Sequence, residues 1–218
     1  IKLGLAGDLH VGSKYHNSSV MKDLFKRFKQ EKVNGIYLTG DITEGYNMRP
    51  GHAHECLYHG ADDQIYAVVE QVPDIKVPIY FITGDHDYSH YKSAGVDVGK
   101  HISEQRDDMH YMGSFNAKIQ IGKKTTIELQ HPAKGTAYAI SYHMQKLAEA
   151  MEGGTKPSIL AVGHYHKIEY LFYRNIHILQ TGTLENQTPW MRRMNLSAHL
   201  GGWVVEFNMK GDGTIDRV

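Results

Sequence analysis

The sequence predicts a domain of the α/β class, with a mixed sheet or two stacked sheets covered by helices. Short apolar, β-branched runs end repeatedly in Gly followed by a polar residue, which is typical of buried and largely parallel strands. Apolar residues at helical spacing lie between several of these runs, and later segments are arranged as hairpins. A chain of 218 residues that is 41% hydrophobic suits one domain over residues 1–218.

The first half of the chain alternates expected strands and helices. The strands are IKLGLAGD (1–8), GIYLTGD (35–41) and IYFITGD (79–85). An amphipathic helix joins the first two, and its apolar face is made of Val20, Leu24, Phe25 and Phe28. Ser18 or Ser19 can cap the start of this helix, and Gly35 can close its end. A second helix is expected at about 61–72.

The second half adds one buried strand, one helix and three hairpins. SILAVGH (158–164) has the pattern of a buried strand, and the helix is expected at about 137–151 with Thr136 as its N-cap. The apolar face of this helix is made of Ile140, Met144, Leu147 and Met151. The hairpins are SFNAKIQI and TTIELQH around GKK, YLFY and IHILQT around Arg174-Asn175, and WVVEFNM and TIDRV around GDG.

Composition narrows the class of function. Lys plus Arg and Asp plus Glu both number 24, so the net charge gives no reason to expect the whole surface to attract nucleic acid. The single cysteine, Cys56, excludes an intrachain disulfide and fits a reducing compartment. No apolar run approaches the roughly 20 residues of a membrane span. We therefore expect a cytoplasmic protein with no membrane partner.

Five expected strands end in side chains that can bind metal ions. These side chains are Asp8, His10, Asp41, Asp85, His86, His131, His164 and His166. Loops at the carboxyl ends of strands form the binding crevice of an open α/β sheet, so these residues can converge. A set of Asp and His without thiolates favours Mn, Fe or Zn over a structural Cys-type zinc site. Each residue alone could be a turn or surface residue, but five such segments in one order are hard to obtain by chance.

The series GDLH, GDITE, GDHD, QHP and GHYH resembles the motifs of the calcineurin-like metallophosphoesterases. The resemblance runs from residue 3 to about 183, nearly the whole chain. It implies a four-layer αββα sandwich of two mixed sheets flanked by helices, with a two-metal site in the loops of the sheets. It also implies a single metallophosphoesterase domain, without the separate capping domain of the related double-strand-break repair nuclease.

The resemblance also implies a role for each matching residue. The first metal would be bound by Asp8, His10 and His166, with Asp41 as the bridging ligand and Asp85, His131 and His164 on the second metal. The two divalent ions would be Mn in the first place, with Fe, Zn, Ni or Mg as alternatives. His86 matches the His that protonates the leaving oxygen after attack by a metal-bridging hydroxide. Glu44 sits where the family often places an acid that orients this His, and Asp87 is a second candidate that could instead brace its loop.

Three features favour a phosphodiester as the substrate. Glu44 is followed by Gly45, whereas phosphoprotein phosphatases of the family carry an Asp-Arg pair there, with the Arg clamping a phosphate dianion. Residues 163–195 are similar to phage and microbial relatives of the DNA-repair nucleases of this fold. Trp190 could stack on a base and Arg192 and Arg193 could bind phosphates, although an anchored loop with solvated Arg side chains fits equally. The expected substrate is nucleic acid or a nucleotide, including a cyclic nucleotide.

An insertion at residues 47–64, NMRPGHAHECLYHGADDQ, follows the expected bridging residue and could form a wall of the substrate site. Its candidate substrate contacts are Arg49, His52, His54 and His59. His90, four residues beyond His86, is a similar candidate. A purely structural loop is the equal alternative.

Two other functions stay open at this point. A phosphomonoesterase that acts on a small phosphorylated molecule would use the same core. A catalytically weakened scaffold is the alternative from a different class, because some proteins of this fold serve as interaction scaffolds. Asp85 bears on activity, because the family usually has Asn at this position. An added negative charge beside the phosphate is expected to weaken substrate binding and reduce turnover.

Overall fold

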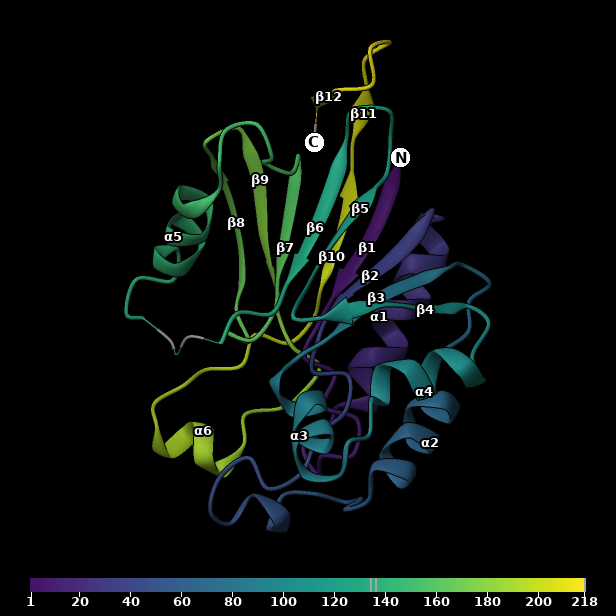
Figure 1. Cartoon of the computed structure of the whole chain (residues 1–218), viewed down its shortest axis with the longest axis vertical. Helices are drawn as coiled ribbons and strands as arrows, with labels where there is room; N and C mark the ends of the chain where they lie inside the picture. The colour runs from purple at the N-terminus through teal and green to yellow at the C-terminus, as the bar shows by residue number, and fades with distance from the viewer. Residues whose placement is uncertain (134, 136, 218) are drawn as a thin grey trace.

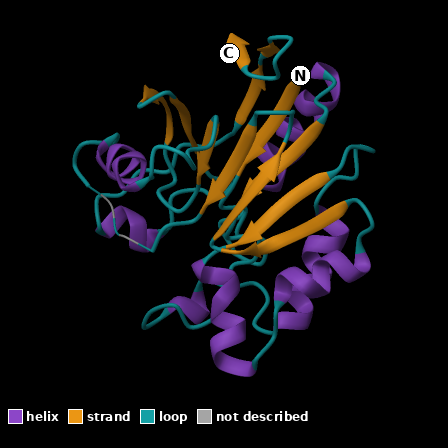
Figure 2. Cartoon of the chain, turned by 45° about the horizontal axis from the view of Figure 1, so that its top comes forward, coloured by secondary structure: helices purple, strands orange, loops and turns teal. Residues whose placement is uncertain are grey.

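The computed structural model describes residues 1–133, 135 and 137–217, and it has four layers. Two five-stranded mixed sheets pack face to face (Figure 1). Helices cover the outer side of each sheet, as Figure 2 shows. This arrangement confirms the predicted αββα sandwich.

The first sheet has the strand order β10-β1-β2-β3-β4. Its strands are β1 (Lys2–Ala6), β2 (Gly35–Thr39), β3 (Ile79–Thr83), β4 (Met109–Ser114) and β10 (Trp203–Glu206). The four strands from β1 to β4 run parallel, and β10 pairs antiparallel with β1. The parallel strands therefore end at one edge of the sheet.

The second sheet has the order β5-β6-β7-β9-β8. Its strands are β5 (Asn116–Gln120), β6 (Thr126–Gln130), β7 (Ile159–Val162), β8 (Ile168–Tyr173) and β9 (Ile176–Thr181). The predicted hairpins appear as the antiparallel pairs β5 with β6 and β8 with β9. The third hairpin is a small separate ribbon of β11 (Asn208–Met209) and β12 (Ile215–Arg217).

Three apolar cores hold the layers together. Alternating residues of each parallel strand face opposite sides: Ile36 and Leu38 contact the helices, and Tyr37 lies between the sheets. The helices on the first sheet are α1 (Ser18–Glu31), α2 (Ala61–Gln71) and α4 (Val98–Gln105). On the second sheet, α5 (Tyr142–Ala150) packs through the buried Met144 and Ala148. None of the described helices is long and apolar enough to cross a membrane.

The ends of two predicted helices differ from expectation. The N-cap of α1 is Asn17, whose side chain accepts from the Val20 amide, rather than Ser18 or Ser19. Lys32 ends α1 in the left-handed conformation, and Gly35 belongs to β2.

The predicted helix over 137–151 is shorter than expected. It begins at Tyr142, so Ile140 precedes it, and Thr136 lies outside the described residues. Four elements were not predicted, namely α3 (Asp85–Ala94), α4, α6 (Pro189–Arg193) and β4. A short 3-10 helix (His52–His54) also lies in the insertion.

Candidate metal centre

The predicted ligand residues meet at the carboxyl ends of strands from both sheets. Asp8 and His10 follow β1, Asp41 follows β2, His131 follows β6, and His164 and His166 follow β7. These loops lie below the sheets in Figure 1, beside α3 and α6. The structure therefore brings together residues that are up to 158 positions apart in the sequence.

Five of these residues have an unusual backbone conformation. Their φ angles are positive, at 50° for Asp8, 49° for His10, 48° for Asp41, 76° for His164 and 54° for His166. Residues other than glycine seldom adopt the left-handed region, although Asp and His do so more readily than most. Such conformations persist where the surrounding structure holds them, and they gather at functional sites. Here they turn the side chains into one space.

The first group of ligand atoms comes from Asp8, His10 and His166, and these atoms all lie within 4.8 Å of one another. His166 Nε2 is 3.1 Å from His10 Nε2 and 3.4 Å from Asp8 Oδ1. The Asp8 carboxylate accepts from the backbone N–H of His164 at 2.9 and 3.0 Å. Two imidazoles and a fixed carboxylate therefore face one point.

The second group comes from Asp41, His131 and His164, with the same limit of 4.8 Å. Asp41 Oδ2 is 3.2 Å from His131 Nε2 and 3.9 Å from His10 Nε2, so this carboxylate stands between the two groups. Asp41 Oδ1 accepts from the backbone N–H of His86 at 2.9 Å. This places Asp41 where the sequence predicts a bridging ligand.

His131 provides a test of whether these residues fit a metal ion. Its Nδ1–H donates to the Thr39 carbonyl at 2.8 Å, so the neutral ring has its lone pair on Nε2. Nε2 is buried, has no hydrogen-bond partner among the described residues, and faces the Asp41 oxygen. Burial alone would lower the pKa of His131, but Asp41 raises it to about 10, so this position attracts a positive charge. A divalent cation bound by oxygen and imidazole fits the pair.

Glu44 supports the first group from behind. Its carboxylate accepts from His10 Nδ1 at 2.8 Å and from His52 Nε2 at 2.9 Å. A carboxylate on the outer nitrogen of a metal-binding His fixes the ring and its tautomer. Burial opposes ionisation, but the bonds from His10 and His52 lower the pKa of Glu44 to about 2.

The expected contact between Glu44 and His86 takes another form. The Glu44 carboxylate is 3.9 Å from His86 Nδ1, whereas the Glu44 backbone carbonyl accepts from this nitrogen at 2.5 Å. Glu44 therefore holds His86 through its main chain and orients His10 through its side chain.

Asp87 is buried away from the ligand atoms. Its two oxygens accept from the backbone N–H groups of Ile42, Thr43 and Gly84 and from the Thr43 hydroxyl, at 2.7 to 3.0 Å. These bonds tie the loop after β2 to the start of α3. The structure thus favours a bracing role for Asp87 over a catalytic one.

Asp85 begins α3, so the stretch expected to be a loop is the N-terminus of a helix. Its Oδ2 is 3.6 Å from His164 Nδ1, but Asp85 is outside the compact groups of ligand atoms. The side chain is partly exposed and lies at the rim of the centre.

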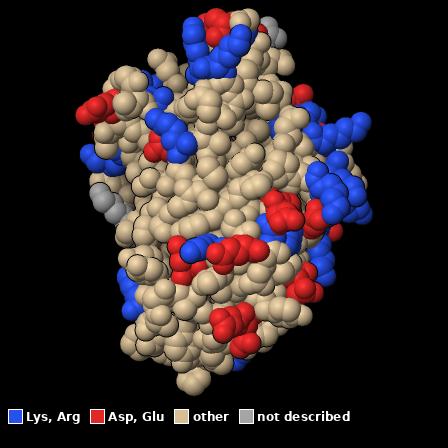
Figure 3. Space-filling view, turned by 45° about the vertical axis from the view of Figure 1, so that its right-hand side comes forward, with Lys and Arg blue, Asp and Glu red and all other residues tan. Residues whose placement is uncertain are grey.

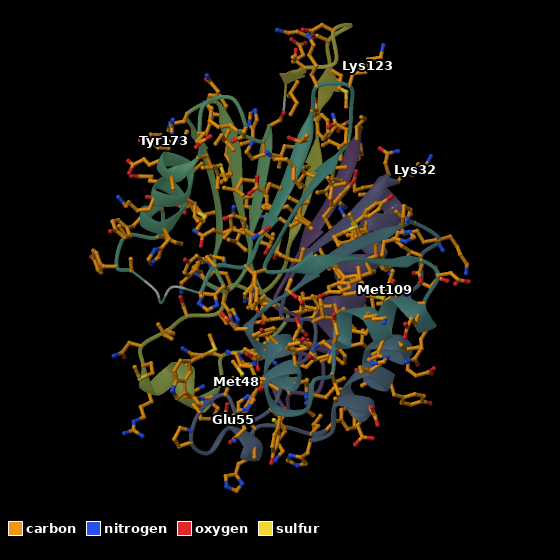
Figure 4. All side chains as sticks on the ribbon, in the orientation of Figure 1. Lys32, Met48, Glu55, Met109, Lys123 and Tyr173 are labelled. Atoms are coloured by element: carbon orange, nitrogen blue, oxygen red, sulfur yellow. The ribbon has the colours of Figure 1, made fainter. Side chains whose placement is uncertain are left out.

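A cleft of about 380 Å³ opens above the ligand groups. Its floor includes His10, Asp41, His86, His164 and His166. Arg49 and Glu55 of the insertion form one side, and Trp190, Met191, Met194 and Leu196 in and after α6 form another. Figure 4 labels Met48 and Glu55 in the insertion, beside α6.

Sequence reasoning missed several residues of the cleft, and two of them, Glu185 and Tyr165, lie beside the candidate ligands. The Glu185 carboxylate accepts from Ser13 Oγ at 2.6 Å, and its ligand atoms lie within 4.8 Å of those of His10 and Glu44. Tyr165 stands between two predicted ligands in the motif GHYH, and this position in the sequence could have indicated that it lies near the site.

The other predicted substrate contacts do not line the cleft. His52 is buried behind Glu44, and His90 is buried on α3 with Nε2 3.3 Å from Gln64 Oε1. His54 and His59 are exposed, and Arg192 and Arg193 line a separate hollow beside Tyr15. Of the predicted substrate contacts, only Arg49 and Trp190 reach the cleft.

Comparison with known proteins gives distant similarities. No family model matches the chain. It is 21% identical over 240 residues to the DNA polymerase II small subunit of Halobacterium salinarum, covering 90% of this chain and 46% of that protein. The corresponding subunit of Methanothermobacter thermautotrophicus is 21% identical over 241 residues, covering 87% of this chain and 48% of that protein. The chain thus spans about half the length of the curated relatives it matches.

Among solved structures, an archaeal phosphodiesterase is 13% identical, covers 84% of each chain and gives a TM-score of 0.49. The chain itself has the layers of the predicted sandwich and carries Asp and His residues after its strands in the predicted order. In these two respects it resembles the calcineurin-like metallophosphoesterases.

Proposed function

We propose that this protein is a metal-dependent phosphoesterase that hydrolyses phosphodiesters of nucleotides or nucleic acid. The observation that carries the proposal is the buried pair of His131 Nε2 and Asp41 Oδ2, which face each other at 3.2 Å at a position that attracts a positive charge. This pair lies between two convergent groups of Asp and His at the floor of a cleft. The relatives named as DNA polymerase subunits are consistent with a substrate of the nucleic-acid class.

The residues present suggest two metal positions. Asp8, His10 and His166 would hold one ion, His131 and His164 would hold the other, and Asp41 would be shared. Asp85 would join the second position through a small movement toward His164. Two divalent ions, with Mn the first choice and Fe, Zn, Ni or Mg as alternatives, would supply a water of lowered pKa and bind phosphate oxygens.

His86 is placed to act as the general acid. His86 Nδ1 donates to the Glu44 carbonyl, so Nε2 is the nitrogen that is left to meet a substrate. The His86 side chain is 22% exposed and lines the cleft. The ring packs edge-on against His10, with centroids 4.5 Å apart, so its rotation is restricted. A positioned imidazole that protonates the leaving oxygen accelerates such reactions by about 10²- to 10⁴-fold.

The cleft suits a diester better than a monoester. Arg49 is the only Lys or Arg among the described lining residues, and it is paired with Glu55. An Arg that clamps a phosphate dianion cannot replace Gly45, because a Cβ there would lie 2.3 Å from the His86 carbonyl oxygen. A phosphodiester carries one negative charge fewer than a monoester dianion, and therefore needs less compensation.

An activity and metal assay tests this function. With Mn²⁺ added, we expect hydrolysis of bis-p-nitrophenyl phosphate in preference to p-nitrophenyl phosphate, and we expect bound metal by elemental analysis. His131→Ala should lose metal and activity together, whereas Arg27→Ala on the outer helix α1 should lose neither. Hydrolysis of the monoester alone would refute the diesterase proposal. A metal-free, inactive protein would instead favour the scaffold.

A further inference from the structure

The insertion and α6 touch each other over the cleft. The guanidinium carbon of Arg49 lies 4.6 Å from the centroid of the Trp190 ring. The same guanidinium is paired with Glu55, and the Arg49 and Glu55 side chains are only 20% and 16% exposed. Arg49 is thus engaged on two sides, by an aromatic face and by a carboxylate. It joins two sides of the cleft through Trp190 instead of offering a free charge to a phosphate.

The space beneath this contact has the size of a small-molecule site. Its volume of about 380 Å³ is near the lower end of the roughly 300 to 1,000 Å³ of ligand pockets. One wall is apolar and partly aromatic, from Trp190, Met191, Met194 and Leu196. Aromatic walls of this kind hold nucleobases by stacking, without regard to sequence.

The charges around the cleft do not suit a long polyanion. Among the described residues, Asp41 would be bound to metal, and the carboxylates of Glu44, Glu55 and Glu185 line the cleft against the single paired Arg49. Binding of extended nucleic acid depends on Lys and Arg that neutralise successive phosphates. On the face in Figure 3, Lys and Arg gather at the top and the right-hand edge, and the remaining charges are of mixed sign.

We propose that the contact between Arg49 and Trp190 is a latch that sizes the cleft for a diester carrying one or two nucleotides, and that excludes the internal linkages of a long strand. The inference rests on the proposed diesterase function for the chemistry, but not for the existence of the latch. Trp190 has two roles in it, because its ring meets Arg49 and also forms part of the cleft wall. Arg49 has only the closing role.

The latch is tested first without any catalysis. Trp190 and Trp203 are the only tryptophans, so Trp203→Phe leaves Trp190 as the single emitter. In this background, Arg49→Ala should increase acrylamide quenching of Trp190 and shift its emission to longer wavelength. Arg27→Ala is the matched control, because Arg27 also pairs with a carboxylate, Glu31 at 2.6 Å, but on α1. Equal quenching in the Arg49→Ala and Arg27→Ala proteins would overturn the latch.

Size selection is tested by hydrolysis with Mn²⁺. The substrates are a dinucleotide and a single strand of about twenty nucleotides, a length that far exceeds the cleft. The intact protein should prefer the dinucleotide. Arg49→Ala should raise kcat/KM for the long strand relative to the dinucleotide by about fivefold. The increase cannot be larger than the free energy of the contact between Arg49 and Trp190 that the substitution removes.

Further variants separate closing from stacking. Glu55→Gln, which keeps the side-chain volume, should loosen Arg49 and shift the substrate ratio in the same direction to a smaller extent. Trp190→Ala should also raise KM for the dinucleotide, and Trp190→Phe should restore it. An intact protein that cleaves the long strand as fast as the dinucleotide would overturn size selection. Failure to cleave any diester would count against the proposed function, and the quenching experiment would still decide the latch.

Discussion

Asp87→Asn should destabilise the fold, because this carboxylate ties two loops of the centre together through four donors. Oδ1 accepts from the Thr43 amide and hydroxyl, and Oδ2 accepts from the amides of Ile42 and Gly84. An Asn amide is best placed with its NH₂ toward Thr43, where the hydroxyl can turn to accept but the amide N–H loses its partner. One orphaned buried donor costs about 1–3 kcal/mol, and bonds to a neutral acceptor are weaker than bonds to a charged one.

These effects together lower the free energy of unfolding by about 3 kcal/mol. For a chain of this size, that corresponds to a loss of roughly 10 °C in Tm and of about 1 M in the urea midpoint. Urea unfolding followed by circular dichroism measures the change, with Thr43→Val as the control that removes a single donor and should cost about 1 kcal/mol. Stability within about 0.5 kcal/mol of the parent, combined with a large loss of kcat, would refute the bracing role and restore Asp87 as a catalytic candidate.

Three other predictions concern the centre. His86→Ala should lower kcat by about 10²- to 10⁴-fold with unchanged metal content, and a parallel loss of metal would contradict the general-acid role. Asp85→Asn should raise kcat/KM about tenfold at equal metal content, since it removes a negative charge near the phosphate; equal or lower turnover would show the reasoning is wrong. Glu44 has a pKa of about 2 in the folded chain, against the ordinary 4.5. In EDTA, which removes metal, the stabilisation from the ionised Glu44 is therefore present above pH 4.5 and is lost as the pH falls toward 2. Glu44→Gln should flatten this acid limb of stability, which amounts to about 3 kcal/mol in urea unfolding at a series of pH values.

The strands could be predicted because both of their faces are buried. In β2 every residue from Gly35 to Thr39 is buried, so the run GIYLT contains no charged residue and is mostly apolar. The helix α3 was missed because its sequence lacks a strong apolar stripe, and α4 was missed because it is short and only Val98 and Ile102 form its apolar face. In α4, Gly99 lies under the ring of Tyr111, where a Cβ would come within 2.5 Å, so a helix-breaking residue marks a close packing contact. Tertiary contact of this kind cannot be recognised from local propensity.

The convergence of the candidate ligand residues was predictable because each follows a strand, and parallel strands end together. The direction of a side chain in an irregular loop has no such rule. His52 and His54 are neighbours in one 3-10 helix, yet His52 is buried against Glu44 and His54 is exposed. Glu185 was missed because its partner Ser13 is 172 positions away, and no periodicity links the two. Its contribution to the cleft is a consequence of tertiary packing alone.

The position of Asp85 at the start of α3 gives this residue two opposing effects, one on folding stability and one on phosphate binding. The same helix end donates the His86 amide to Asp41, so this N–H group faces the metal centre, whereas the Gly84 amide bonds to Asp87. A carboxylate at the first position of a helix gains about 0.3–1 kcal/mol from the helix dipole. Repulsion of a phosphate about 4 Å away is worth up to about 4 kcal/mol at an effective dielectric near 20, before screening. Asp85→Asn should therefore act in opposite directions, with a slight loss of folding stability and a larger gain in phosphate binding, and a change of the same sign in both would contradict this account.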